Sequence, residues 1–451
     1  MTQRPAVRSG RMLALAVALL VTGPVTRADA GPAAHARLVA SEPASGDTLT
    51  FGPERIRLVF SEPVDPGSSE ILLITSAAHV ERLQPERDSS DVRALVATAP
   101  RLARGAYRVS WRVLSADGHP VAGDFVFFVR AGDDPSAALP GPPPRAGPGS
   151  AIVEPSSAGT RAAAATLRGL GVGSLLALAG LLAFLAWIAP GGGRRPHQAA
   201  IVLTWAAAAL LAAHLWAWWR FASGQAWTEP DSIRTMLETA PGRLELLRVG
   251  LACGALWALA LARRPGMAAV FAAAGVAIGG AIGHAFTNSP LFSVPAKSIH
   301  LVASGLWLGG LLWLVLADPA DPRFLAGAHR VSALAFAAVL AIAVTGAIQV
   351  FVLLQRPSDL IQSGYGALVL AKVGGLLVLT LFGARHRFRL LPRAREISAR
   401  TDLRRSVRVE TAILAGVILL AGVLAYVSPP GPAGRASSGQ ISSPTENEAR
   451  R

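Results

Sequence analysis

The sequence predicts an all-β immunoglobulin-like sandwich joined by a Pro/Gly-rich linker to an all-α polytopic membrane bundle of about eight transmembrane helices. Three observations support this fold class. Up to residue 130, short apolar runs alternate with period two and are separated by turn residues. A segment rich in Pro, Gly, Ala and Ser follows. Beyond it, long uncharged apolar runs dominate a chain that is 52% hydrophobic, which is typical of a membrane protein.

Residues 1–30 have the organisation of a secretory signal peptide. Three arginines precede an apolar run from Met12 to about Val21, and Ala28-Asp29-Ala30 supplies small residues for cleavage. The apolar run is too short to cross a bilayer. We therefore expect the following residues to lie outside the cytoplasm.

Residues 31–130 are expected to form the β-sandwich, because about seven short strands fit into this length. The chain has one cysteine, Cys253, which lies in a later apolar span, so the sandwich must be held by its apolar core. The clearest strand runs are Ile56–Phe60, Glu70–Thr75, Val92–Thr98, Tyr107–Leu114 and Gly123–Val129.

A polar motif lies between the last two of these strands. Apolar and polar residues alternate along Tyr107–Leu114, and the alternation stops at Asp117-Gly118-His119. Gly118 lets the backbone bend, so a carboxylate and an imidazole can converge at the sheet edge, as in one half of a metal site. Asp-Gly is also the commonest hairpin signal, and a turn Asp often caps its own backbone, so the motif alone also fits a plain β-turn.

The remaining boundaries follow from composition. Residues 131–161 are predicted to be a flexible linker, 162–427 a transmembrane domain and 428–451 a disordered tail. Each apolar span has about 20 residues, enough for about 30 Å of helix. The eight spans lie near 165–189, 199–220, 245–262, 267–286, 298–317, 331–354, 366–384 and 407–427.

The charge pattern orients these spans and limits the function. The formal net charge is +15, but the arginines cluster in alternate short loops, which the positive-inside rule explains better than nucleic-acid binding does. This orientation places the sandwich and the C-terminal tail on the outer side. The sequence contains no G-x-x-x-x-G-K-[ST] phosphate loop, so ATP-driven pumping is not supported.

Ionisable residues within the spans are functional candidates, because burying them in a bilayer is costly. His214, His284 and His300 all fall in the outer third of the predicted bilayer. Imidazoles at one depth could pass a metal ion inward, or could be interfacial histidines bonded to helix ends or headgroups. Lys372, about 10 Å into its span, could repel a cation, lock helices through carbonyls or act in gating.

Three further features have structural interpretations. Glu410 is expected to pair with Arg385 or Arg387. The cluster Trp216-Ala217-Trp218-Trp219 is predicted to anchor its helix at the membrane interface. Small residues within Ser304–Gly310 predict close helix packing.

Several segments together match a known pattern. In the β region they are His35-Ala36-Arg37-Leu38, Ser41-Glu42-Pro43-Ala44-Ser45-Gly46, Leu58-Val59-Phe60-Ser61-Glu62-Pro63-Val64, Tyr107-Arg108-Val109-Ser110-Trp111 and Ser115-x-Asp117-Gly118-His119-Pro120-Val121-x-Gly123. This set resembles the periplasmic copper-resistance family CopC. The membrane part resembles its inner-membrane partner family CopD, on Gly283-His284-Ala285, His300 with Trp307-x-Gly309-Gly310, and Lys372. The chain therefore looks like a natural CopC–CopD fusion.

The resemblance implies a Cu(II) site made by the first mature histidine with its free amine and by the Asp and His of the D-G-H turn. Carried over, these ligands are His35, Asp117 and His119, and Cu(II) favours such nitrogen and oxygen ligands. Cleavage after Ala30 would leave four residues ahead of His35, which departs from the pattern. None of the four methionines lies in the β region, so no Cu(I) thioether site is expected there.

We therefore expect a copper-binding inner-membrane protein of copper homeostasis or resistance that is not an enzyme. Its periplasmic domain would bind Cu(II) and hand it to the bundle for transport, in the import direction. The expected partners are copper ions, the lipid bilayer and periplasmic copper chaperones, with no nucleic acid. Two alternatives remain. One is a haem- or copper-redox membrane protein, in which paired histidines hold haem. The other is a copper sensor or scaffold without transport.

Overall fold

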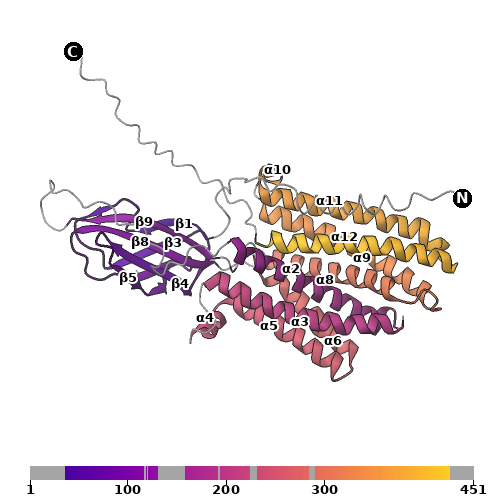
Figure 1. Cartoon of the computed structure of the whole chain (residues 1–451). Coiled ribbons are helices and arrows are strands. Elements are labelled where there is room, and N and C mark those ends of the chain that lie inside the picture. Colours follow the sequence, from indigo (N-terminus) through magenta and orange to yellow (C-terminus); the bar gives the residue numbers. More distant parts are fainter. Residues whose placement is uncertain are drawn as a thin grey trace, which may run out of the picture.

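The structure is a computed structural model that describes residues 36–115, 118, 120–130, 158–190, 193–223, 231–283, 290–354 and 356–426. A β domain lies at one end of a bundle of helices (Figure 1). The predicted signal peptide and tail, and most of the predicted linker, lie outside the described residues. The first helix of the bundle begins at Ala158, inside the predicted linker.

Within the described residues, the β domain has nine strands in two sheets. One sheet has the order β1-β3-β7-β6 and the other the order β2-β9-β8-β4-β5. All pairings are antiparallel except that of β2 with β9. An immunoglobulin-like topology remains a prediction. The strands are β1 (Leu38–Glu42), β2 (Thr48–Leu49), β3 (Arg55–Phe60), β4 (Val64–Thr75), β5 (Val80–Leu83), β6 (Pro85–Arg87), β7 (Ala94–Thr98), β8 (Gly105–Ser115) and β9 (Pro120–Val129).

Apolar side chains from both sheets form the core of this domain. Trp111 of β8 packs edge-on against Phe60 of β3, with ring centroids 5.2 Å apart. Gly123 of β9, opposite Trp111 in the ladder, leaves room for the indole, because a Cβ there would lie 2.5 Å from the ring. Burying a large apolar side chain contributes about 1.5–3 kcal/mol, so this aromatic contact can hold the sheets together without a disulfide.

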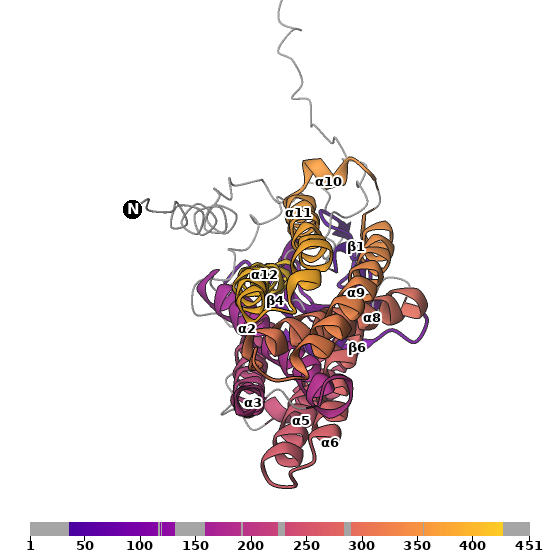
Figure 2. The same ribbon diagram turned by 90° about the vertical axis from the view of Figure 1, so that its right-hand side faces the viewer.

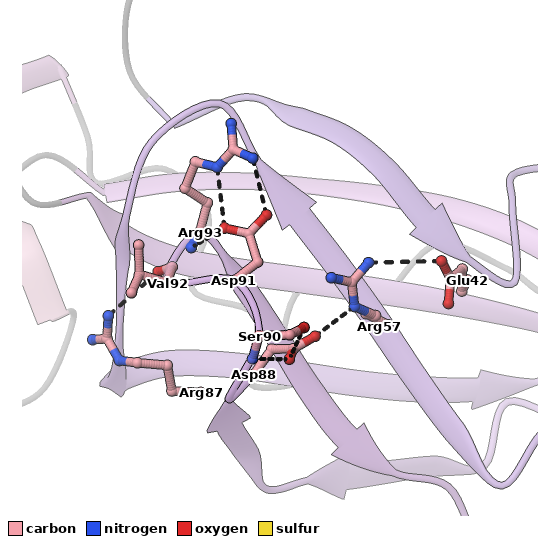
Figure 3. A network of polar contacts seen from close by, with 8 residues as sticks. All are labelled: Glu42, Arg57, Arg87, Asp88, Ser90, Asp91, Val92 and Arg93. Atoms are coloured by element: carbon pink, nitrogen blue, oxygen red, sulfur yellow. Dashed lines mark hydrogen bonds and ion pairs between the residues drawn. The ribbon is translucent and has the colours of Figure 1, made fainter.

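A polar network fixes the loop that precedes β7 onto β3 (Figure 3). The Arg57 guanidinium lies 2.6 Å from an Asp88 carboxylate oxygen, and Ser90 donates to the same carboxylate through its backbone N–H and its hydroxyl. These hydrogen bonds from Ser90 and Arg57 hold the pKa of Asp88 well below its ordinary value. The loop is therefore anchored by charge-assisted hydrogen bonds as well as by its backbone.

The described part of the helical region is a bundle of long helices joined by shorter ones. Its elements are α2 (Ala158–Ala183), η1 (Phe184–Ile188), α3 (Arg194–Ser223), α4 (Ser232–Glu238), α5 (Ala240–Ala260), α6 (Pro265–Ile278), η2 (Gly279–Ala281), α8 (Pro290–Leu316), α9 (Phe324–Leu353), α10 (Asp359–Gln362), α11 (Gly364–Arg385), η3 (His386–Leu390), η4 (Leu391–Arg393) and α12 (Ile397–Leu424).

Six of the described helices are long and apolar enough to cross a membrane. They cover most of each predicted span other than the third and fourth. The third span falls on α5, which carries Glu245 and Arg248, and the fourth falls on the 14-residue α6. Helices therefore form at all eight predicted positions, but the count of eight membrane crossings remains a prediction.

The two central helices of the bundle, α2 and α8, cross at glycines. A Cβ on Gly180 would lie 1.9 Å from the Gly305 carbonyl oxygen, and one on Gly309 would lie 2.1 Å from the Gly180 carbonyl carbon. This confirms the close packing predicted for Ser304–Gly310, because only glycine permits such an approach. Seen along the bundle, α2 and α8 lie between α11 on one side and α5 and α6 on the other (Figure 2).

Candidate metal centre

The structure describes the middle of the Asp-Gly-His motif. Asp117 and His119 lie outside the described residues, as do His35 and His284. Gly118 is described, with a φ of +88°, and its N–H donates to the Ser115 carbonyl at 2.8 Å. A left-handed φ favours glycine. β8 ends at Ser115 and β9 begins at Pro120, so the two strands predicted on either side of the motif are confirmed.

This turn rests on the end of the helical bundle. The Gly118 carbonyl accepts a hydrogen bond from Trp218 Nε1 of α3 at 3.2 Å. A Cβ on Gly118 would lie 3.3 Å from the Trp218 ring and 3.4 Å from Pro241 of α5. Leu114, at the end of β8, joins a buried apolar cluster that includes Trp219 and Met236. The β domain therefore contacts the bundle directly at α3, α4 and α5.

The tryptophan cluster corrects the prediction of a simple membrane anchor. Trp216 is 56% exposed, as an anchor facing lipid would be, but Trp218 and Trp219 are only 4% and 0% exposed. Trp218 supports Gly118, and Trp219 donates to Ser232 at 2.7 Å at the start of α4. Two of the three tryptophans therefore hold the domain contact.

Arg112 of β8 adds a charged contact to this interface. Its guanidinium donates to the carbonyls of Ser223, of Ala222 at 2.8 Å and of Phe221 at 3.4 Å, at the C-terminal end of α3. The side chain is buried, and burial lowers the pKa of Arg112 while the nearby Glu70 carboxylate opposes this shift. A cation at the C-terminus of a helix also interacts favourably with the helix dipole.

A buried polar cluster lies further into the bundle from the Gly118 turn. Of its members, the sequence predicted only His214 as a functional residue. His214 of α3 is fully buried, with Nδ1 3.2 Å from the Ala164 carbonyl oxygen and Nε2 3.6 Å from Glu245 Oε1. Glu245 of α5 also lies 3.0 Å from Arg248 Nη1 and 3.6 Å from Arg168 Nη1. One carboxylate therefore lies within 3.6 Å of two guanidinium groups and one imidazole.

The cluster is aligned with the turn along both helices. Trp218 is four residues after His214 on α3, and Pro241 is four residues before Glu245 on α5. Residues four apart lie on one helix face, about 5–6 Å from each other. The two residues that touch Gly118 therefore stand about one helical turn above His214 and Glu245.

The other predicted membrane residues lie apart from this pair. His300 of α8 places Nδ1 3.1 Å from the Thr345 hydroxyl of α9, and Lys372 of α11 is half-buried. Lys297, which no sequence motif indicated as functional, donates to the Ile282 carbonyl. Among the residues that the structure describes, no three His, Cys, Asp or Glu side chains converge as metal ligands.

A second carboxylate–imidazole pair lies near the end of the bundle away from the β domain. Glu410 Oε2 lies 2.8 Å from His386 Nδ1, and the other oxygen accepts from Trp307 Nε1 at 3.2 Å. The predicted pairing of Glu410 with Arg385 or Arg387 is therefore wrong. Arg385 instead donates to the Ser406 hydroxyl at 3.0 Å.

Comparison with known proteins assigns both parts of the chain. A family model described as CopC domain matches residues 38–130, and one described as Copper resistance protein D, CopD, matches residues 326–424. The chain belongs to the CopC–CopD family of copper-resistance proteins. Copper transport protein CutJ of Bacillus subtilis (strain 168) is 26% identical over 427 residues, which cover 89% of this chain and 75% of CutJ.

Two further relatives cover the CopC domain. Copper resistance protein C of Xanthomonas campestris pv. juglandis is 34% identical over 110 residues, 23% of this chain and 86% of that protein. The crystal structure of CopC from Methylosinus trichosporium OB3b has 33% identity and a TM-score of 0.21, covering 22% of this chain and 98% of that one.

The residues described above lie either within the two matched regions or between them. Gly118 lies in the CopC domain, and Lys372, His386 and Glu410 lie in the matched CopD region. His214, Glu245 and His300 belong to helices α3, α5 and α8, between the two matched regions. The helices that contact the β domain therefore lie between the two matched regions of the chain.

Proposed function

We propose that the protein binds Cu(II) through its β domain and hands the ion to the helical bundle, which carries it across the inner membrane towards the cytoplasm. Family membership supports a role in copper resistance or transport. The observation that carries the handover is the contact of Gly118 with Trp218 and Pro241. Gly118 is the middle residue of the motif that supplies two of the proposed ligands.

The proposed Cu(II) ligands are Asp117, His119 and His35. Asp117 and His119 are the sequence neighbours of Gly118, which contacts the bundle. Consecutive Cα atoms are about 3.8 Å apart. Imidazole nitrogen and carboxylate oxygen suit the tetragonal geometry of Cu(II). His35 precedes Ala36, which is buried in the β core.

The proposed orientation follows from the sequence. A cleaved signal peptide at residues 1–30 and basic loops in the cytoplasm would put the β domain in the periplasm. There the domain could receive copper from periplasmic chaperones. Inside the bundle, His214, His284 and His300 are the proposed path, and Lys372 would limit cation passage by its charge.

Uptake of radioactive copper by cells tests this proposal. Cells producing the wild-type protein should accumulate copper above the level of vector-only cells, and the double variant Asp117→Ala/His119→Ala should fall to the vector level. His79→Ala is the matched control, because His79 is an exposed histidine of the same domain and should leave uptake unchanged. Wild-type uptake equal to that of vector-only cells would refute transport.

The haem alternative needs paired imidazoles on facing helices. In the described part of the bundle, His214 Nε2 faces Glu245 and His300 Nδ1 faces Thr345. No observation therefore favours haem binding over copper transfer.

A further inference from the structure

The imidazole of His214 has an unusual environment on its two nitrogens. Nδ1 lies 3.2 Å from the Ala164 carbonyl oxygen, which can only accept, so Nδ1 carries the proton. In a neutral imidazole Nε2 then presents a lone pair. Nε2 is buried without a hydrogen-bond partner and faces Glu245 Oε1 at 3.6 Å. A lone pair and a carboxylate oxygen therefore point at each other.

A cation held between the two atoms would satisfy both of them. A proton on Nε2 would be shared at a donor–acceptor distance of about 2.7–3.2 Å, so 3.6 Å is too long for that hydrogen bond. Two ligand atoms each about 2.0–2.1 Å from one metal ion are separated by about 2.9 Å at a right angle and about 4.1 Å in line. The observed gap corresponds to an angle of about 120° at such a metal.

We propose that His214 and Glu245 form a second copper site, a transfer site inside the bundle. This inference rests on the proposed function and adds Glu245 to the path. The pair stands about one helical turn below Trp218 and Pro241, which contact Gly118. The Ala164 carbonyl fixes the tautomer that leaves Nε2 free to bind, as outer partners of metal-binding histidines do.

The two neighbouring arginines favour weak, reversible binding of a cation at this site over permanent binding. Arg248 and Arg168 compensate the buried Glu245 carboxylate when no metal is bound. The same two charges repel an arriving cation and so lower its affinity. An ion in transit must bind well enough to enter and weakly enough to leave, and two ligands beside two guanidinium groups meet both conditions.

A direct copper titration tests the site. The full-length chain is purified with the first site removed by His35→Ala, Asp117→Ala and His119→Ala, and Cu(II) binding is followed by electron paramagnetic resonance. We expect one bound ion with one imidazole nitrogen ligand. His214→Ala and Glu245→Gln should each weaken binding at least about tenfold. His329→Ala, which removes an exposed bundle imidazole, should change nothing.

Arg168→Met supplies a second readout that does not depend on removing a ligand. The Arg168 side chain is more exposed than those of Glu245 and Arg248, so its loss should be tolerated if His214→Ala or Glu245→Gln fails to fold. Removing its charge should tighten copper binding, whereas a purely structural arginine would have no such effect. Thermal melting and gel filtration check folding of every variant.

The results separate this inference from the proposed function. Copper binding unchanged in folded His214→Ala, or no tightening in folded Arg168→Met, would overturn the transfer site. Absence of a bound ion in the chain lacking the first site would overturn it equally. A wild-type protein that takes up no copper in cells would instead refute the transport proposal, and the titration of the purified protein would still decide the second site.

Discussion

Arg112→Met should release the β domain from the bundle. The substitution keeps an unbranched side chain of similar length but removes the guanidinium that donates to the carbonyls of Ser223, Ala222 and Phe221. A hydrogen bond to a charged group contributes about 1.5–3 kcal/mol, so the two shorter bonds together contribute about 3–6 kcal/mol to docking. Each 1.4 kcal/mol is a factor of ten, so the docked-to-undocked ratio should fall by about 10²–10⁴.

Cross-linking between the two parts measures this ratio. A Cβ on Gly67 would lie 3.0 Å from Glu238 Oε2, so Gly67→Cys and Glu238→Cys place thiols side by side only in the docked state. The exposed Cys253 is first replaced by serine. A short bismaleimide should then link the docked protein rapidly and the Arg112→Met variant slowly, with copper uptake reduced in parallel.

Arg108→Met is the matched control for this experiment. Arg108 lies four residues earlier on the same face of β8 and pairs with Asp124 inside the β domain. Its loss removes the charged partner of Asp124 and leaves the contacts of Arg112 in place, so cross-linking should stay at the wild-type rate. Equal cross-linking rates in Arg112→Met and wild type would refute the argument that Arg112 holds the domain in place.

Two further predictions concern stability. Gly309→Ala should destabilise the bundle by at least about 1–3 kcal/mol, because its Cβ would lie 2.1 Å from the Gly180 carbonyl carbon, whereas Gly416→Ala, with nothing within 4 Å, should be nearly neutral in thermal melting. Similar melting of the two variants would contradict the packing argument. Because the pKa of Asp88 is lowered by Ser90 and Arg57, its stabilising contribution is complete above the unfolded pKa of about 4 and is lost as the pH falls towards the folded value. Asp88→Asn should therefore flatten the acid side of the melting profile of the β domain, and an unchanged profile would count against this role.

Local pattern was enough to predict the strands and helices but not the contact between them. The run Tyr107–Leu114 lies inside β8, because period-two alternation reports which face is buried. Arg112 falls on the polar face of that run, yet the structure buries it against the bundle. Its partners lie about 110 positions away along the chain, and no short-range pattern carries that information.

The candidate site shows the same limit. His214 was identified because an imidazole within an apolar span is conspicuous. Glu245 stood at the first residue of a predicted span, where a carboxylate is expected at the bilayer surface. The spacing of Glu245 and Arg248 was the available signal, since oppositely charged residues three apart lie on one helix face and can pair. Trp218 and Trp219 were misassigned because hydropathy does not distinguish lipid from a docked domain.

The continuity of the chain between β9 and α2 has a kinetic consequence. Val129 ends one domain and Ala158 begins the other, so the β domain can never diffuse away from its helices. A short covalent connection holds two modules at an effective concentration of the order of millimolar, independent of the amount of protein in the cell. Under the proposed function, copper flux should therefore rise in direct proportion to the copy number of the protein. A relay of two separate proteins would instead vary with the product of their concentrations until binding saturates.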